Sequence, residues 1–393
     1  MESVILGGGY AGLLAASVIS QAGYDVLVLD DGTAPETGTA PLPRHGAVLR
    51  VGGIGDIGDL VYGSRRALED EGAQTSPAEI AGHAKVTHNR SGHQAWEAPS
   101  LLTCTWELLN HTLRHSVLAS PEIGRETTVW DTTTAVGLIG NSRAVQGVRV
   151  RHLDGTETTI TAELVVDASG PTSDAPAWLS RLGVPAIPTV TDRANGITAT
   201  RIYRPAPSGN DLAMMAANSC NRRAVFVPVE NGRWHVTQQL PASEFLADET
   251  FEQSVLTETD PILGELLNGA EPLSEVAVSR MVTSRWRRYD QLRSWPRGFI
   301  AIGDAVATWN PLYLHGPQAA EAGARALREA LAHGINDPAL ARRTQQMIGR
   351  AVADLRTTPG TPCQQRRPHH DNAVTRRRRL VAGATQLVSH CIR

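Results

Sequence analysis

The chain opens with two short apolar runs that flank a glycine-rich turn and a longer apolar stretch. Ser3–Leu6 predicts a strand, residues 7–12 a tight turn, the Ala- and Leu-rich residues that continue to Gln21 a helix, and Val26–Leu29 a second strand. A strand, a helix and a strand in this order predict a parallel βαβ unit.

Elements of the same kind return after residue 100. Leucines and valine at helical spacing predict a helix over residues 106–118, and a second helix is expected over 317–333. Short buried strands are expected at 164–166 and 299–302, each followed by a polar turn. Residues 32–60 are rich in Gly, Pro and Thr, which favours a loop passing over a ligand rather than a packed element.

Between about residues 190 and 285 the pattern changes to short β segments joined by turns. Residues 224–229 and 233–240 flank Glu230-Asn231-Gly232, which is typical of a β-hairpin. We therefore expect an antiparallel sheet inserted into a first domain that is discontinuous in sequence.

Composition excludes several classes of function. The net charge of −3 gives no reason to expect a nucleic acid partner. The four cysteines are far apart and lack metal-ligand spacing, so we expect reduced thiols and no metal. No segment reaches the roughly 20 apolar residues of a membrane span, and the N-terminus lacks the pattern of a signal peptide, so a cytoplasmic protein is expected.

The turn after the first strand carries the pattern GxGxxG. Gly7, Gly9 and Gly12 permit a tight turn and close backbone approach, so that a pyrophosphate can lie on the helix N-terminus. Asp30 ends the second strand, where a carboxylate can bind an adenosine ribose. In this context we interpret the turn as a dinucleotide site.

Two later motifs also follow predicted strands. They are residues 167–173, DASGPTS, and Gly303-Asp304-Ala305 with the continuation Trp309-Asn310-Pro311 and Gly316. Together with the glycine turn, they resemble the class A single-component FAD-dependent monooxygenases, the family of p-hydroxybenzoate hydroxylase. The sequence of residues 285–311 is most similar to bacterial epoxidases that act on polyketide and terpenoid alkenes. The resemblance to the family as a whole covers roughly residues 1–345.

The resemblance implies an α/β fold in which a Rossmann-like FAD-binding domain carries an inserted antiparallel β-sheet substrate domain. The expected boundaries are 1–75, 100–185 and 285–350 for the FAD-binding domain, 76–99 and 186–284 for the substrate domain, and 351–393 for a helical, basic tail. The cofactor-binding residues so implied are Gly7, Gly9, Gly12, Asp30, Arg44, Arg114, Asp167, Gly303, Asp304, Pro311 and Gly316. Arg44 and Arg114 could instead form surface salt bridges.

The same resemblance implies the chemistry. NAD(P)H, bound transiently, would reduce FAD, O2 would add at flavin C4a, and the hydroperoxide would pass oxygen to a small hydrophobic molecule of secondary metabolism. Epoxidation and hydroxylation, NADH and NADPH, and the oligomeric state remain open at this point.

Candidate residues around the reacting centre come from the loop before the helix expected over 317–333 and from the inserted antiparallel sheet. Pro311 and His315 are the candidate catalytic residues, because they flank the expected flavin position and histidine titrates near neutrality. Trp234, Trp309 and Tyr313 are the candidate substrate contacts. Trp234 could equally be a core residue, and His315 a structural one.

Two departures from the family pattern bear on catalysis. Pro171 stands where the family commonly has arginine, and Leu314-His315 where it has glycine and glutamine. Two other functions therefore stay open: an FAD-dependent dehydrogenase or reductase, and a non-redox cyclase or binding protein that retains the fold. A flavin halogenase is disfavoured, because no WxWxIP-like segment occurs and Lys85, the sole lysine, lacks a matching context.

Overall fold

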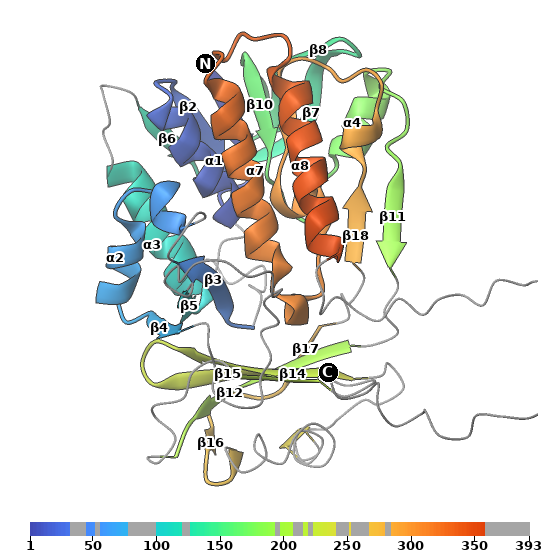
Figure 1. The fold of residues 1–393 in the computed structure, drawn as a ribbon. Helices are drawn as coiled ribbons and strands as arrows, with labels where there is room; N and C mark the ends of the chain where they lie inside the picture. Colours follow the sequence, from blue (N-terminus) through green and yellow to red (C-terminus); the bar gives the residue numbers. More distant parts are fainter. Residues whose placement is uncertain are drawn as a thin grey trace, which may run out of the picture.

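The computed structural model places a helix-covered parallel sheet above a flat antiparallel sheet (Figure 1). The residues that it describes are 1–31, 45–51, 56–77, 100–119, 126–192, 197–206, 215–218, 223–240, 251–252, 267–279 and 284–357.

The upper part is organised by a five-stranded parallel sheet with the order β19-β10-β1-β2-β6. All five strands are short. β1, β2, β10 and β19 are wholly buried, as expected for a sheet covered on both faces, whereas the edge strand β6 is partly exposed. Their bounds are Ser3–Leu6 (β1), Val26–Leu29 (β2), Thr127–Trp130 (β6), Leu164–Asp167 (β10) and Phe299–Ala301 (β19).

Helices pack on this sheet and on one another. In Figure 1, α1, α7 and α8 stand side by side, and small residues such as Ala15 and Gly323 let helices and sheet approach closely. The helices are Tyr10–Gln21 (α1), Ser64–Asp70 (α2), Trp106–Ala119 (α3), Ala175–Arg181 (α4), His315–Leu331 (α7) and Leu340–Thr357 (α8).

Three small sheets extend the upper part. The first has the order β3-β5-β4, with strands Ala47–Val51 (β3), Ser100–Cys104 (β5) and Gln74–Pro77 (β4). The second has the order β7-β8-β9, with strands Thr134–Asn141, Ala144–Arg151 and Glu157–Thr161. The third has the order β11-β18-β20, with strands Thr189–Asp192, Ser284–Arg287 and Ala307–Thr308.

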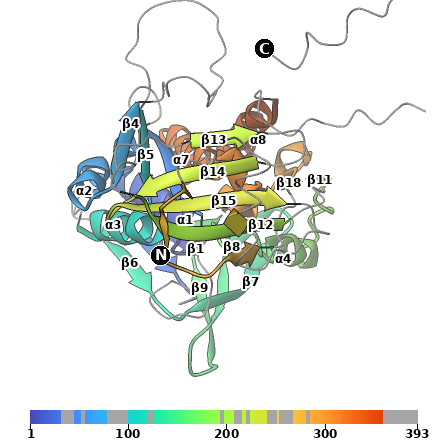
Figure 2. The same ribbon diagram turned by 90° about the horizontal axis from the view of Figure 1, so that it is seen from below.

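The lower part is an antiparallel sheet with the order β13-β14-β15-β12-β16, whose central strands lie side by side in Figure 2. Val229 pairs with Arg233, so β14 and β15 are joined by the three residues 230–232. Asn231 and Gly232 both have positive φ, a conformation that Asn and Gly tolerate in turns. The strands are Ile197–Arg204 (β12), Met215–Asn218 (β13), Arg223–Val229 (β14), Arg233–Leu240 (β15), Glu271–Pro272 (β16) and Ala277–Ser279 (β17), the last pairing with β12.

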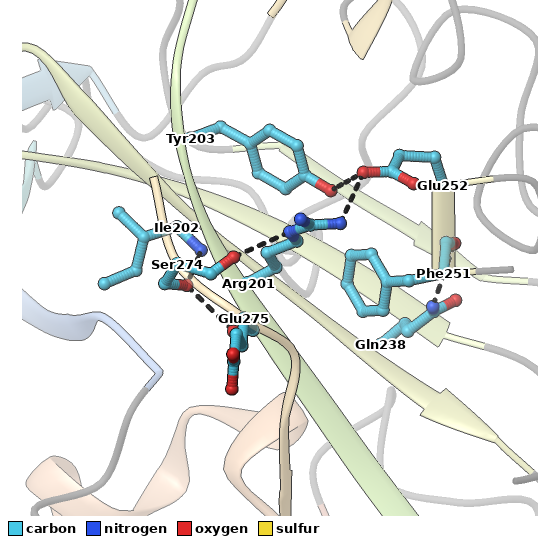
Figure 3. Close-up of polar contacts among 8 residues, drawn as sticks. All are labelled: Arg201, Ile202, Tyr203, Gln238, Phe251, Glu252, Ser274 and Glu275. Carbon is cyan, nitrogen blue, oxygen red and sulfur yellow. Dashed lines mark hydrogen bonds and ion pairs between the residues drawn. The ribbon is translucent and has the colours of Figure 1, made fainter. Parts of the chain in front are cut away.

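The two faces of this lower sheet have different partners. One face carries Tyr203, Phe226 and Trp234 in a core of its own. Polar contacts on that face, drawn in Figure 3, hold neighbouring segments: Glu252 accepts hydrogen bonds from Arg201 at 2.8 Å and from Tyr203 at 2.9 Å. The other face turns toward the upper part.

A buried carboxylate fastens the lower sheet to the upper part. Glu230, in the β14–β15 turn, accepts hydrogen bonds from the backbone N–H of Thr105 at 3.0 Å and from its hydroxyl at 2.7 Å, and pairs with Arg233 at 3.3 Å. Thr103 adds a hydrogen bond to the carbonyl of Pro228 at 2.6 Å. The hairpin is thus fixed to the start of α3.

The expected fold class is confirmed: a Rossmann-type parallel sheet is interrupted in sequence by a separate antiparallel sheet. The expectation of a plain loop over residues 32–60 is wrong in part, because Ala47–Val51 is a buried strand and Ile57–Asp59 a 3-10 helix. Cross-strand pairing with Ser100–Cys104 stabilises that strand, and no local pattern announces such a distant partner. Helix α8 continues past the expected domain boundary at residue 350.

In the described part of the chain, no helix is both long enough and apolar enough to cross a bilayer. Over the same residues, His, Cys, Asp and Glu form no group of three that could hold a metal ion.

Glu230→Ala is expected to lower the free energy of unfolding by about 2–4 kcal/mol, because it leaves the buried N–H of Thr105 without a partner. The matched control is Glu157→Ala, which removes an ion pair to Arg151 from a carboxylate that is 39% exposed and should cost less than about 1 kcal/mol. Urea unfolding of both variants checks this. Equal effects would mean that Glu230 does not anchor the hairpin.

Candidate active site

The three motifs identified in the sequence meet at one edge of the parallel sheet. Leu6 of β1 lies in register with Leu29 of β2 and with Asp167 of β10, and Asp167 with Ala301 of β19. The turns that follow these strands therefore emerge together, at the carboxyl edge where α/β sheets bind ligands.

Glycines allow these turns to touch. A Cβ added at Gly7, which has φ +104°, would lie 2.6 Å from the carbonyl oxygen of Ala168 in the second motif. A Cβ at Gly303, with φ +58°, would lie 2.6 Å from the Cβ of Ala11 in α1. Any side chain at either position would push the motifs apart, so these glycines are required by packing.

Gly9 differs from the other glycines of the fingerprint. It is exposed at the N-terminus of α1, and a Cβ built there would meet no atom within 4 Å, whereas one at Gly12 would lie 1.9 Å from the carbonyl oxygen of Gly7. Free space in front of unpaired helix N–H groups is what a pyrophosphate needs.

Asp30 lies beside this turn. A Cβ at Gly8 would lie 2.3 Å from a carboxylate oxygen of Asp30, so the acid packs directly on the glycine turn. Arg114 pairs with Asp30 at 3.5 Å and with Asp131 at 2.7 Å. Arg114 therefore orients the carboxylate of Asp30, and its role as a cofactor contact stays a prediction.

Asp167 is occupied within its own loop. Its carboxylate accepts hydrogen bonds from the N–H and hydroxyl of Ser169, at 3.1 and 2.5 Å, and from the hydroxyl of Ser173 at 2.6 Å. Burial raises its pKa, although these hydrogen bonds act in the opposite direction. Asp167 thus shapes the second motif, and its direct contact with a cofactor stays a prediction.

Asp304, in the 3-10 helix Gly303–Ala305, is in the opposite situation. Burial raises the pKa of its carboxyl to about 6, against the attraction of Arg285. Among the described residues, no group hydrogen-bonds this carboxylate. Asp304 is therefore an acceptor available to hydroxyl groups of a ligand, while Arg285 itself donates to the carbonyl of Pro171.

The loop that the resemblance places against the flavin runs from Trp309 to Gly316 and is called the flavin loop. Asn310 accepts a hydrogen bond from the backbone N–H of Leu312 at 3.1 Å and donates one to Gln239 of β15 at 2.9 Å. The loop continues through the 3-10 helix Pro311–Tyr313 into α7, and a Cβ at Gly316 would meet nothing within 4 Å. The loop is thus tied to the lower sheet and opens onto free space.

Leu314 holds the left-handed conformation, with φ 57° and ψ 24°, immediately before α7. That conformation costs a non-glycine residue about 1–2 kcal/mol. Its side chain packs against the cluster of Leu312, Val225 and Val227, which joins the loop to β14. The fold therefore demands a glycine-like backbone here, and hydrophobic packing compensates for the leucine.

His315 and Trp309 lie against each other at the two ends of this loop. Their ring centroids are 5.2 Å apart in an edge-to-face arrangement, and His315 is buried. Pro311 lies between them in the chain. Arg44 and the side chain of Tyr313 lie outside the described residues, and the predictions for both stay open.

Trp234 lies on the far face of the lower sheet, packed on Phe226 with a centroid distance of 6.2 Å. The face that meets the flavin loop instead carries His235, Thr237 and Gln239 of β15. Alternation along β15 predicted two faces, but only the packing decides which one is inward. The geometry therefore gives no support to Trp234 as a substrate contact.

One buried pair was missed from the sequence. Tyr10, inside the glycine fingerprint, donates a hydrogen bond to Glu321 of α7 at 2.9 Å. Burial raises the pKa of Glu321 to about 7, although Tyr10 and Arg325 lower it. The available signal was an acid on the otherwise small and apolar face of α7.

A second missed group lies next to this pair. Trp106 meets Tyr10 edge to face and donates to His45 Nδ1 at 3.4 Å. The Nδ1 atom of His45 also lies 3.1 Å from the carbonyl oxygen of Gly46, and burial lowers the pKa of His45 to about 4. The aromatic group thus links the first turn of α1 to the residues just before β3.

The hydrogen-bonding groups and the open space around these turns fit FAD. The open space at Gly9 can take the pyrophosphate, Asp30 the adenosine ribose and Asp304 the ribityl hydroxyls. The free backbone N–H groups at the start of α7 give that end of the helix a positive partial charge, which favours a bound anion.

Comparison with known proteins agrees with this geometry. Residues 1–345 match the model of a family described as FAD binding domain, and the chain belongs to that family. It is 28% identical to Protein Rv3254 of Mycobacterium tuberculosis over 84% of this chain and 73% of that protein.

Solved structures share the fold. PqsL, a probable FAD-dependent monooxygenase from Pseudomonas aeruginosa, superimposes with a TM-score of 0.63 at 18% identity over 91% of this chain and 90% of its own. The flavin-dependent brominase Bmp2 gives a TM-score of 0.63 at 17% identity over 87% and 82%. The chain is thus a flavoprotein of the p-hydroxybenzoate hydroxylase fold, whose relatives include both monooxygenases and halogenases.

Gly9→Val should abolish FAD binding and leave the fold intact, because Gly9 is extended and exposed and its side-chain space is empty until the pyrophosphate enters. Gly12→Val should instead unfold the protein, because its Cβ would overlap the carbonyl of Gly7. Flavin absorbance and circular dichroism of both variants check this. A folded Gly9→Val protein with full flavin content would refute the assigned cradle.

Stability should fall as pH rises through the range set by Glu321. Its folded pKa of about 7 exceeds the ordinary value of 4.5, so between these values the folded state keeps a proton that the unfolded state releases. The free energy of unfolding falls by an amount on the order of 3 kcal/mol, and the fall is complete above about pH 7. Asp304 adds a smaller fall that ends near pH 6.

Glu321→Gln should therefore flatten the decline in stability of the FAD-free protein between about pH 5 and about pH 8. Glu329→Gln, an exposed position on the same helix, is the control and should keep the parental decline. Urea unfolding at a series of pH values decides, and equal declines in all three proteins would exclude Glu321 as the cause.

Proposed function

We propose that the chain is an FAD-dependent monooxygenase that uses NAD(P)H and O2 to epoxidise or hydroxylate a small hydrophobic natural product. The observation that carries the proposal is the carboxylate of Asp304. It lies at the carboxyl edge of the parallel sheet, half-buried and without a hydrogen bond inside the described chain, beside a loop that the antiparallel sheet covers.

When bound, FAD supplies the redox and oxygen chemistry, so the protein has to orient the two reactants and exclude water. Asp304 is largely ionised above its pKa of about 6 and accepts the ribityl hydroxyls. The backbone N–H groups at the start of α7 place positive potential where negative charge develops. His315, at the first position of α7, can hold or deliver a proton at that edge.

The apolar interface between the antiparallel sheet and the upper part excludes water. Leu312 packs with Val225, Val227 and Val229 of β14 and with Val48 and Leu101 of the upper part. Next to this apolar side, Thr200 and Thr237 share a buried hydrogen bond of 2.9 Å on the inner face of the sheet. We expect a mostly apolar substrate with a polar group to bind beside this packed interface, at the loop from Trp309 to Gly316.

Other uses of the same fold remain alternatives. The likeness to a brominase shows the fold alone, and Lys85, the one lysine of the chain, lies outside the described residues. A dehydrogenase would reduce FAD without consuming O2 in an oxygenation, and a non-redox cyclase would not be reduced by a nicotinamide at all. These differences define the experiment.

The purified protein is expected to be yellow, and NADH or NADPH added without oxygen should bleach the oxidised flavin spectrum. In air, a panel of alkenes and phenols should include a compound that accelerates nicotinamide oxidation and gains one oxygen atom from 18O2, detected by mass spectrometry. Asp304→Ala is the matched control and should purify with little flavin. A product that gains halide and no labelled oxygen would establish a halogenase, and a flavin that nicotinamide never reduces would overturn the proposal.

A further inference from the structure

The indole N–H of Trp309 is a buried donor that no group of the described chain accepts. More than nine in ten buried polar groups in folded proteins have a partner, since an unmet donor costs about 1–3 kcal/mol. Such an atom at a ligand-binding edge indicates that its partner is a bound molecule.

Trp309 is firmly placed. It follows β20 and precedes Asn310, whose amide is anchored to Gln239, and its ring lies against that of His315 at an angle of 74°. The ring is partly exposed, although the nitrogen is buried. Neighbours on both sides thus hold the donor at the start of the flavin loop.

Other tryptophans of the chain have different surroundings. Trp295 donates to the carbonyl of Phe299 at 2.7 Å, and Trp106 donates to His45. Trp286 also has an unpartnered N–H, but its ring is 6% exposed and lies under the guanidinium of Arg288, 3.9 Å from the ring centroid. Trp309 is the one of these four that combines an unmet donor with a place on the loop.

The start of α7 explains why an additional donor is useful there. The third residue of the helix is Pro317, which has no N–H, so the first turn offers fewer free backbone donors than an ordinary helix N-terminus. An indole N–H at the other end of the loop adds a donor that this helix lacks.

We propose that Trp309 Nε1–H donates a hydrogen bond to a carbonyl or oxyanion oxygen of a molecule bound at the flavin loop. This proposal rests on the proposed function. Flavin carbonyls and the oxygen of a conjugated substrate, such as a phenolate or an enone, offer the same acceptor chemistry. If the oxygen belongs to the substrate, the enzyme favours oxygen-bearing conjugated compounds over plain alkenes.

The test observes the indole directly. The protein is labelled with 15N at tryptophan side chains, and the Trp309 signal is assigned as the one missing from Trp309→Phe. A downfield shift of that signal when FAD is added to the FAD-free protein identifies a flavin carbonyl as the acceptor. A shift that appears only when 4-hydroxybenzoate, and not styrene, is added to the FAD-bound protein identifies a substrate oxygen. No shift in either step overturns the proposal.

Affinity provides a second readout. Trp309→Phe keeps an aromatic ring and should weaken binding of the identified ligand about three- to tenfold, the value of one hydrogen bond. Trp286→Phe makes the same chemical change away from the loop and should leave that affinity unchanged. Equal losses in the two variants would reduce Trp309 to a packing residue.

The proposed function can fail separately. A protein that binds FAD and shows the Trp309 shift, but incorporates no oxygen from 18O2, would retain this donor and refute the monooxygenase.

Discussion

The site depends on the close approach of three backbone turns at one edge of a parallel sheet. Each turn follows a strand, and the strands are in register, so the turns must share the same small space. Side chains at Gly7 or Gly303 would separate them by collision with Ala168 or Ala11. Since the open space at Gly9 and the carboxylate of Asp304 belong to different turns, one ligand can bridge both only because these glycines let the turns meet.

The lower sheet acts on this site through a few buried contacts rather than through a broad polar surface. Glu230 fixes the hairpin to α3, and Gln239 holds the loop through Asn310. Leu314 adds apolar packing that compensates for its left-handed backbone. The loop is therefore held in place by the antiparallel sheet, and under the proposed function substrate and flavin would be positioned by the same framework. This coupling is consistent with an enzyme that must exclude water from its reacting centre.

Buried ionisable groups add a dependence on pH that the sheet architecture does not require. Glu321 and Asp304 have raised pKa values for the same reason, the loss of solvation on burial. Their uses differ, because Glu321 is hydrogen-bonded by Tyr10 within the protein whereas Asp304 has no such partner in the described chain. The first stabilises helix packing at a cost that grows with pH, and the second is left available to a ligand.

The sequence alone determined the parallel βαβ opening, the three motifs and the inserted antiparallel sheet, because these are written in local signals: apolar runs, glycine turns and strand-ending acids. It could not determine that Trp234 faces away from the flavin loop, since alternation defines two faces but not which is inward. It also missed the strand Ala47–Val51 and the bond between Tyr10 and Glu321, which are 311 positions apart. Those features arise from contacts between distant segments, and they exist only once the chain has folded. The same holds for the burial that leaves the indole N–H of Trp309 without an acceptor in the described chain.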